Sequence, residues 1–330
     1  MTETPASAER RREGMTTPPS GFVPRWQREY SALAVLFALL LFLAITRPAF
    51  FSADNLRDIL VNNSYVMIAG VGATIVILAA GIDISIGSML AACAVTAGDL
   101  AHRGTPLWLV ILATLAMGAS LGLVNGGFVA WLNVPPIIVT LGTLSIYRGA
   151  VIWYTQGVWI QGLPASFLFL GQGTVWGVPV PVWVAAGTVL AGVLFLQKTR
   201  CGRHIYAIGG NPLAAELAGI RVNRIRLLTY VISGMSVGLS ALVYASRFSQ
   251  IQSNTGIGFE LLVITAVVVG GTNIFGGVGS IWGTVCGVLL LGAVDPALAY
   301  RHISSYWEGA IQGCFILFGI SGDALRTRKR

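Results

Sequence analysis

The sequence predicts an all-α membrane protein: a polytopic bundle of about ten transmembrane helices, some of them broken. Hydrophobic residues make up 55% of the 330-residue chain and charged residues only 10%, against about 25% charged residues in soluble domains. Because so few charges cannot cover a water-facing surface, the outside of the fold must face lipid. The 41 glycines agree with this prediction, since glycine is common where membrane helices pack closely or break.

Most of the basic residues are gathered into three clusters, which lie at 10–28, 198–226 and 326–330 and are separated by apolar sequence. Membrane proteins carry their excess of Lys and Arg in cytoplasmic segments, so we expect all three clusters and both termini in the cytoplasm. The net charge of +8 could also suggest nucleic-acid binding. No basic surface interleaved with aromatic residues supports that function, so we expect no nucleic-acid partner.

Hydropathy divides the chain into a polar tail, residues 1–28, and a membrane domain, residues 29–330. The tail is rich in Thr, Pro, Ser, Glu and Arg, which predicts disorder. It is too long for the n-region of an ordinary signal peptide, and many further spans follow, so we expect an uncleaved first helix. The predicted spans have their centres at 31–46, 62–80, 86–100, 106–125, 136–155, 179–197, 227–246, 261–274, 281–294 and 309–322.

Several of these segments are shorter than the roughly 20 residues that a straight span needs, which predicts extended ends or broken helices. The charge pattern agrees with the count. Six segments separate the tail from the central basic cluster, and four more return the C-terminus to the same side. The loop at 156–178 is uncharged and surrounded by tryptophans, as expected of an outer interfacial loop.

Two stripes of glycine at four-residue spacing predict close helix packing, and they comprise Gly118, Gly122 and Gly126 and then Gly279, Gly283 and Gly287. A weaker similarity joins residues 77–88 to residues 267–280, each an apolar run, a glycine-rich break and a second apolar run. Repeated and interrupted spans of this kind indicate a transport site.

Asp83 is the first candidate for that site, because an ionisable residue at membrane depth is a functional hypothesis in itself. The alternative is structural: Asp83 or Ser85 would cap the next helix. The two roles are compatible, since a capped half-helix can face a polar cavity.

The segment around Arg148 is the second candidate. Thr140, Thr143 and Tyr147 fall on one face of a helix, with Arg148 beside them. This face would line a hydrophilic path or bond to a neighbouring helix. Alternatively, Arg148 extends outward to the interface.

Other polar residues near the spans complete the candidate set. Glu260 opens the eighth span, either as an interfacial carboxylate without a role or as the partner of an arginine. Thr272 and Asn273 occupy the second glycine-rich break, and Asn125 lies at the end of the fourth span.

No enzyme motif in the sequence lies in the structural context that its chemistry requires. Residues 234–238 fit the G-x-S-x-G pattern of hydrolases, but they lie inside an apolar span rather than at a strand-to-helix turn. The three histidines lie in separate segments, and no metal or cofactor motif is present. No phosphate-binding loop occurs either, so any ATP hydrolysis must take place on another polypeptide.

The central basic segment, residues 198–226, contains a short predicted helix that Asn211 and Pro212 start and Gly219 ends. It is either a docking element for a soluble partner or a surface helix at the lipid boundary.

Four ordered segments, GIDISIGS at 81–88, NGGFVAWLNVPPIIVTLGTLSIYRGA at 125–150, GRHIYAIGGNPLAAELAGI at 202–220 and FELLVITAVVVGGTNIFGGVGSIWGT at 259–284, resemble the ribose-type sugar permeases of bacterial ABC importers. The resemblance runs from about Asn55 to Asp323. It implies a permease subunit without enzymatic activity in the bacterial inner membrane. The implied solute is a monosaccharide: a pentose, a hexose, a deoxyhexose such as rhamnose, or a furanosyl autoinducer.

The resemblance also implies partners and roles. The partners are ATPase subunits, a periplasmic sugar-binding protein and a second permease copy, identical or paralogous. The substrate would pass between the copies near Asp83, Ser85, Asn125, Thr140, Thr143, Arg148, Glu260, Thr272 and Asn273. The central segment would contact the ATPase through Arg203, Gly209, Asn211, Ala215, Glu216 and Gly219.

Two functions of other classes stay open. An ion-coupled secondary transporter would use Asp83 and the broken helices, and would work without an ATPase. An intramembrane hydrolase would use Ser236, but no histidine lies in any predicted span to serve as its base.

Overall fold

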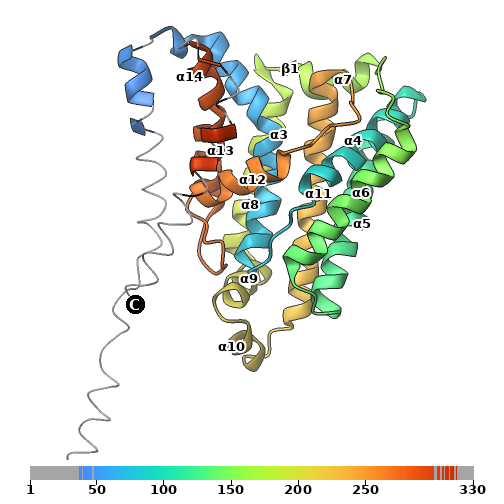
Figure 1. Cartoon of the computed structure of the whole chain (residues 1–330), viewed down its shortest axis with the longest axis vertical. Helices are drawn as coiled ribbons and strands as arrows, with labels where there is room; N and C mark the ends of the chain where they lie inside the picture. The colour runs from blue at the N-terminus through green and yellow to red at the C-terminus, as the bar shows by residue number, and fades with distance from the viewer. Residues whose placement is uncertain are drawn as a thin grey trace, which may run out of the picture.

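A bundle of membrane-type helices forms almost all of the structure, a computed structural model (Figure 1). It describes residues 37–38, 40–46, 48–300, 303–304, 307, 309–311, 313–315 and 317. Its elements in chain order are the 3-10 helix η1 (Pro48–Phe51), α3 (Ala53–Leu78), α4 (Ile86–His102), α5 (Leu107–Trp131), α6 (Pro136–Thr155), α7 (Ala165–Gln172), β1 (Thr174–Val175), β2 (Val178–Pro179), α8 (Val180–Lys198), α9 (Arg200–Gly210), α10 (Pro212–Leu217), α11 (Val222–Phe248), α12 (Phe259–Val269), α13 (Ile281–Gly292) and α14 (Val294–Tyr300).

The all-α membrane class is confirmed, but the count of ten spans is not. Within the described residues, six helical segments are long and apolar enough to cross a membrane. Two other predicted spans correspond to α4 and α12, which are shorter apolar helices of 17 and 11 residues. The tail at 1–28 and part of the predicted spans at 31–46 and 309–322 lie outside the described residues.

The predicted span at 261–274 was too long, and local chain chemistry explains the difference. Helix α12 ends at Val269 because Gly270 and Gly271 follow it, and Gly271 has a φ of +92° that a helix cannot continue. At the other extreme, α3 begins well before the predicted span. Its cap is Ser52, whose side chain accepts a hydrogen bond from the Asn55 amide at 3.3 Å.

Helix α11 lies at the centre of the bundle and packs directly on α5 through glycine. A Cβ atom on Gly118 would overlap the Gly234 carbonyl, and one on Gly122 would overlap the Tyr230 carbonyl. The first glycine stripe therefore serves helix packing, as predicted. The second stripe does the same between α13 and α12, where Gly283 lies on Gly270 and Gly287 on Ala266.

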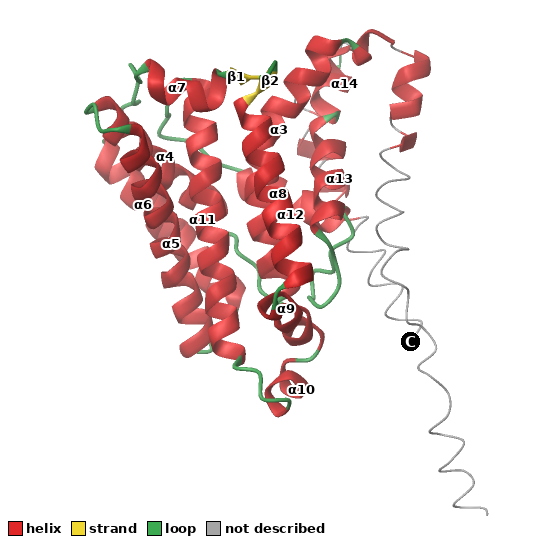
Figure 2. Ribbon diagram, turned by 180° about the vertical axis from the view of Figure 1, so that it is seen from behind, coloured by secondary structure: helices red, strands yellow, loops and turns green. Residues whose placement is uncertain are grey.

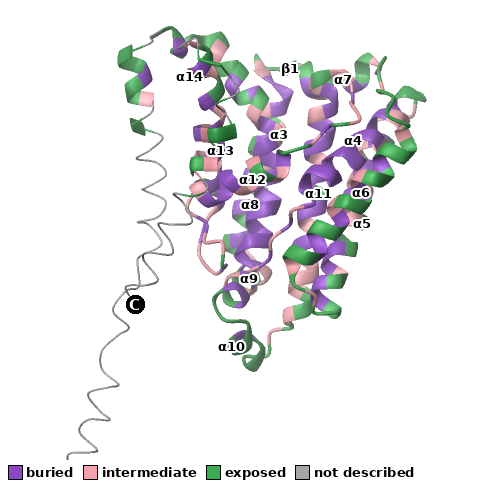
Figure 3. Ribbon diagram, viewed as in Figure 1, coloured by how far each residue is buried: buried purple, intermediate pink, exposed green. Residues whose placement is uncertain are grey.

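Burial is uneven across the bundle (Figure 3). Helices α3 and α11 are mostly buried, whereas α5 and α6 present long apolar faces outward. Exposed apolar surface of this extent faces lipid or another protein.

The two long connections lie at opposite ends of the bundle (Figures 1 and 2). The connection 156–178, predicted as one loop, contains α7 and the start of the hairpin β1–β2, in which Val175 pairs with Val178. The central basic segment lies at the other end. It contains α10, which begins at Pro212 as predicted, and also α9, which the sequence analysis did not anticipate.

Candidate functional site

The first glycine-rich segment breaks the helical path inside the bundle. After α3 ends at Leu78, the chain runs without regular structure to Ile86, where α4 begins about half-way along the bundle (Figure 1). Ala80 takes a left-handed φ of 58°, which is unusual for a residue other than glycine. Such a break leaves backbone amides at the start of α4 in need of partners.

Asp83 supplies a partner to the chain just before α4. Its Oδ1 accepts hydrogen bonds from the Ser85 amide at 2.9 Å and from the Ser85 hydroxyl at 2.6 Å, and both residues are buried. These bonds close a turn directly before α4, which begins at Ile86, so Asp83 does not cap an amide within the helix and the predicted capping role is not confirmed. Ser85 directly precedes α4, but its own side chain makes no capping bond.

Helices α5 and α6 extend this arrangement into a buried polar cluster. The Asn125 amide donates to the Ser85 hydroxyl at 2.8 Å and weakly to Asp83 at 3.5 Å. Tyr147 donates to the Asn125 carbonyl oxygen at 3.2 Å. Among the described residues, Oδ2 of Asp83 has no partner although it is buried. We call Asp83, Ser85, Asn125 and Tyr147 the Asp83 cluster.

Thr140 and Thr143 lie on the same buried face of α6 as Tyr147, as their spacing predicted. Their hydroxyls are largely occupied within their own helix, however. Thr140 donates to the Pro136 carbonyl at 2.9 Å, and Thr143 to the Thr140 carbonyl at 3.4 Å. They border the Asp83 cluster rather than join it.

Arg148 and Glu260 form a second group, where the N-terminal ends of α4 and α12 meet. Arg148 is half-buried and donates to the Thr255 carbonyl at 2.6 Å, so it points inward instead of extending to the interface. Glu260 accepts from the Gly258 amide at 3.3 Å, and its carboxylate also lies against Gly87 in the first turn of α4. A carboxylate at this place is favourable, because both helix N-termini carry partial positive charge.

The second break, residues 270–280, closes on itself and touches the first. The side-chain oxygen of Asn273 accepts a hydrogen bond from the Phe275 backbone amide at 3.1 Å. The backbone amide of Asn273 donates to the Val278 carbonyl at 2.8 Å. Thr272 is buried, and its hydroxyl has no partner among the described residues. The Gly277 amide donates to the Leu78 carbonyl at the end of α3 at 3.0 Å. The two breaks predicted from sequence are therefore neighbours.

Helix α9 contacts both breaks at once. Gly209 packs so closely on the Leu78 carbonyl and on Gly277 that a Cβ atom there would overlap both. The Tyr206 hydroxyl donates to the Gly279 carbonyl at 3.0 Å.

The remaining residues predicted to contact an ATPase lie around α10. Asn211 caps this helix by accepting from the Ala214 amide at 3.0 Å, and Gly219 follows it with a φ of +83°. Ala215 is buried, whereas Arg203 and Glu216 are exposed.

The structure thus divides the predicted site residues into three groups: the Asp83 cluster, the neighbouring but not directly bonded Arg148 and Glu260, and the second break. Sequence reasoning missed Thr255, which holds Arg148, and Tyr230, whose hydroxyl donates to the Ile82 carbonyl at 3.3 Å. Neither had a signal, because Thr255 lies outside the predicted spans and Tyr230 looks like an ordinary core residue. Within the described residues, no group of His, Cys, Asp or Glu could hold a metal ion.

Comparison with known proteins gives one consistent answer. The family described as "Branched-chain amino acid transport system / permease component" matches residues 55–319. The ribose import permease protein RbsC of Haemophilus influenzae is 39% identical over 308 residues, 92% of this chain and 94% of that protein. RbsC of Escherichia coli K12 is 37% identical over 306 residues, 92% and 95% of the two chains. The autoinducer 2 import system permease protein LsrC of an Enterobacter species is 36% identical over 290 residues, 88% and 84% of the two chains. No solved structure matches the chain.

These matches confirm the resemblance to ribose-type permeases, because they cover nearly the whole chain and nearly the whole of each relative. They also show a transport subunit rather than an enzyme. The G-x-S-x-G pattern accordingly has a packing role: Gly234 and Gly238 lie against α5. The chain belongs to the family of transport-system permease components, as a multi-pass protein of the inner membrane.

Proposed function

We propose that this chain is the membrane-spanning subunit of an ATP-driven importer for a monosaccharide. The observation that carries the proposal is sequence similarity to two ribose import permeases, which are 39% and 37% identical to this chain over 92% of its length. The autoinducer 2 permeases, similar over 88% of the chain, keep a furanosyl solute among the candidates. The solute is a pentose, a hexose, a deoxyhexose such as rhamnose, or the autoinducer.

The chain forms the transport path and transmits the movement of the ATPase to it, and the separate ATPase supplies the energy by hydrolysing ATP. The coupling segment is 198–226, with Arg203 and Glu216 on the docking surface. Support comes from the position of α9, because Gly209 contacts the end of α3 and the second break together. Movement of α9 by the ATPase would reach both breaks through rigid backbone contacts.

The solute path lies between two permease copies, identical or paralogous, with a periplasmic binding protein delivering sugar at the α7 end. The exposed apolar face of α6 supports a second copy at that helix. Arg148 and Glu260 are the polar groups at mid-depth beside it, and the Asp83 cluster lies behind them. Recognition in the path is weak, because tight binding would slow release.

In the membrane, the α9–α10 end faces the cytoplasm, and both termini lie on that side. Support comes from the placement of the uncharged connection 156–178 and the basic segment 198–226 at opposite ends of the bundle.

Sugar flux into proteoliposomes tests this function. One set holds the chain alone, and the other holds it with its ATPase and binding protein, with and without ATP. We expect flux only in the complete set with ATP. Ion-gradient-driven flux from the chain alone, abolished by Asp83→Asn, would instead establish the rival secondary transporter.

A further inference from the structure

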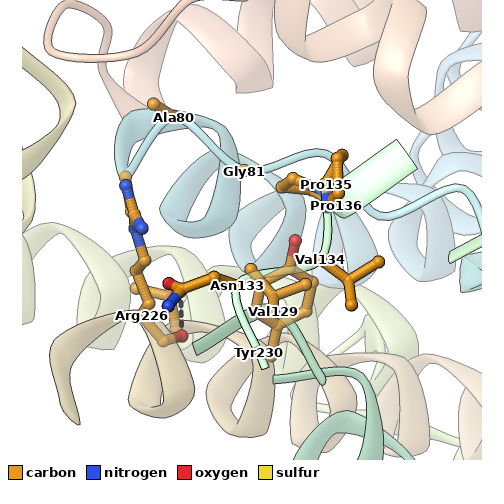
Figure 4. Close-up of a pocket in the computed structure, with 11 residues that line it drawn as sticks. Ala80, Gly81, Val129, Asn133, Val134, Pro135, Pro136, Arg226 and Tyr230 are labelled. Atoms are coloured by element: carbon orange, nitrogen blue, oxygen red, sulfur yellow. Dashed lines mark hydrogen bonds between the residues drawn. The ribbon is translucent and has the colours of Figure 1, made fainter. Parts of the chain in front are cut away.

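A small polar cavity lies at the α9–α10 end of the bundle, beside the first break (Figure 4). Its volume is about 130 Å³, close to the roughly 150 Å³ of an engineered cavity that admits benzene. Three segments line it: the chain after α3 at Ala79–Gly81, the end of α5 and start of α6 at 129–136, and the first turns of α11. One small ring therefore fits inside.

Two side chains offer hydrogen-bond donors to this cavity. Arg226 extends from α11 toward Ala80, and the Asn133 side chain lies beside it (Figure 4). Within the described part of the chain, neither side chain makes a hydrogen bond or an ion pair. Asn133 is held in this turn with a left-handed φ of 52°, a conformation that Asn adopts more readily than most residues.

The segment after α3 forms another wall of the cavity. The carbonyls of Ala79, Ala80 and Gly81 follow the C-terminal end of α3 and accept no hydrogen bond from any described residue. The end of α3 also carries partial negative charge. An anion would meet this wall unfavourably, and an apolar ligand would leave the donors unpaired. A neutral molecule with several hydroxyl groups satisfies both walls.

One residue separates the cavity from the Asp83 cluster. Tyr230 lines the cavity, and its hydroxyl donates to the Ile82 carbonyl, directly before Asp83. Thr140 also reaches that carbonyl, at 3.4 Å. Both bonds are long and therefore weak, whereas the Tyr230 ring itself is buried and packed.

We propose that this cavity is a solute-binding site at the cytoplasmic exit of the path, with Tyr230 between it and the Asp83 cluster. Its ligand is the transported solute, a neutral polyhydroxylated ring held by Arg226, Asn133 and the carbonyls of 79–81. The cavity opens beside the start of α6, the helix proposed to line the path. The inference rests on the proposed function, because it takes the cavity's ligand to be the transported sugar.

Protection of a cysteine from labelling tests the site in the complete importer. The four natural cysteines of this chain are first replaced by Ala or Ser. Val134→Cys, which lines the cavity, is the main reporter. Asn133→Cys, which lines it too but removes one proposed ligand contact, is the second. Leu132→Cys is the matched control, because its side chain is 64% exposed and does not line the cavity. A maleimide is added with increasing amounts of ribose, rhamnose or autoinducer 2, and labelling of this chain is read by mass spectrometry.

We expect the sugar that the cysteine-free parent imports to slow labelling at 133 and 134. By mass action, a concentration ten times Kd gives about tenfold protection. Labelling at 132 should not change, and Arg226→Gln should remove the protection at 133 and 134.

Two results overturn the inference, and they are distinguishable. If the parent imports a sugar but that sugar protects neither reporter, the exit site is wrong and the proposed function stands. If the complete importer carries none of these sugars, the proposed function fails and the exit site fails with it.

Discussion

Asp83 is buried at a point where the chain has lost its helical hydrogen bonds, and its carboxylate replaces some of them. A buried carboxylate is costly unless it is hydrogen-bonded. Here the Ser85 amide, the Ser85 hydroxyl and the Asn125 amide bring donors to it from two elements. The residue therefore connects the break to α5, whatever it contributes to the path.

Replacing Asp83 by Ala should destabilise the protein substantially. The change leaves the buried amide and hydroxyl of Ser85 without their acceptor, and each such loss costs about 1–3 kcal/mol. Thermal unfolding in detergent measures the effect. Asp99→Ala is the control: its ion pair with Arg103, at 2.9 Å, is solvent-exposed and worth about 0–1 kcal/mol. Equal losses in the two variants would contradict the role of Asp83.

Helices α4 and α12 each begin inside the bundle, and their N-terminal ends meet at Gly87. The approach is so close that the Gly256 carbonyl and the Glu260 carboxylate occupy the space of a Gly87 side chain. Helix α9 makes a similar contact with the breaks through Gly209. At both joints a glycine permits backbone contact that a larger residue would prevent.

Gly87→Ala should therefore force the N-terminal ends of α4 and α12 apart. Overpacking of this kind costs about 1–3 kcal/mol, so we expect a lower melting temperature and slower import. Gly187→Ala is the matched control in α8, where a Cβ atom meets nothing within 4 Å. In that helix the same change should be neutral or stabilising by up to about 1 kcal/mol. A Gly87→Ala protein as stable as the control would refute the close contact.

Gly209→Ala should uncouple import from ATP hydrolysis, since it pushes α9 away from Leu78 and Gly277. We expect at least about tenfold slower import, equivalent to about 1.4 kcal/mol, with ATPase activity retained. The adjacent Gly210→Ala should have little effect, because a Cβ atom there meets nothing within 4 Å. Parallel losses of import in both variants would argue against a specific joint at Gly209. Import and ATPase rates are measured in the same proteoliposomes.

At the scale of the whole molecule, the bundle has two chemically different ends and an exposed apolar side. At the α7 end, the connection 156–178 is uncharged and includes exposed tryptophan, with Trp176 90% exposed, whereas the α9–α10 end is basic. The side formed by α5 and α6 is apolar and outward-facing. Such a molecule has one orientation in the membrane and one side suited to lipid or a second copy.

Labelling of intact cells and inverted vesicles should place the two ends on opposite sides. In a chain without its natural cysteines, Trp176→Cys should react with an impermeant maleimide from the periplasm. Leu217→Cys in α10, at an 83% exposed position, should react only in inverted vesicles. Reaction of both from one side would disprove the placement of the α7 end and the α9–α10 end on opposite sides of the membrane.

The sequence alone determined the membrane class, the two breaks, the glycine stripes and the start of α10. These follow from composition and local spacing, because hydropathy, helix caps and small-residue patterns act over a few turns. The four ordered motifs in the sequence also indicated the family. It overestimated α12 and missed α9, because helix ends depend on single glycines and on contacts with other elements.

Only the tertiary structure decided which polar residues meet. Asp83 and Asn125 are 42 positions apart and bonded, while Arg148 turns inward to Thr255 and Gly209 contacts both breaks. The cavity between Arg226 and the end of α3 likewise joins three distant segments. Such contacts depend on how the helices pack, and helix packing is a property of the whole bundle that no local pattern in the chain encodes.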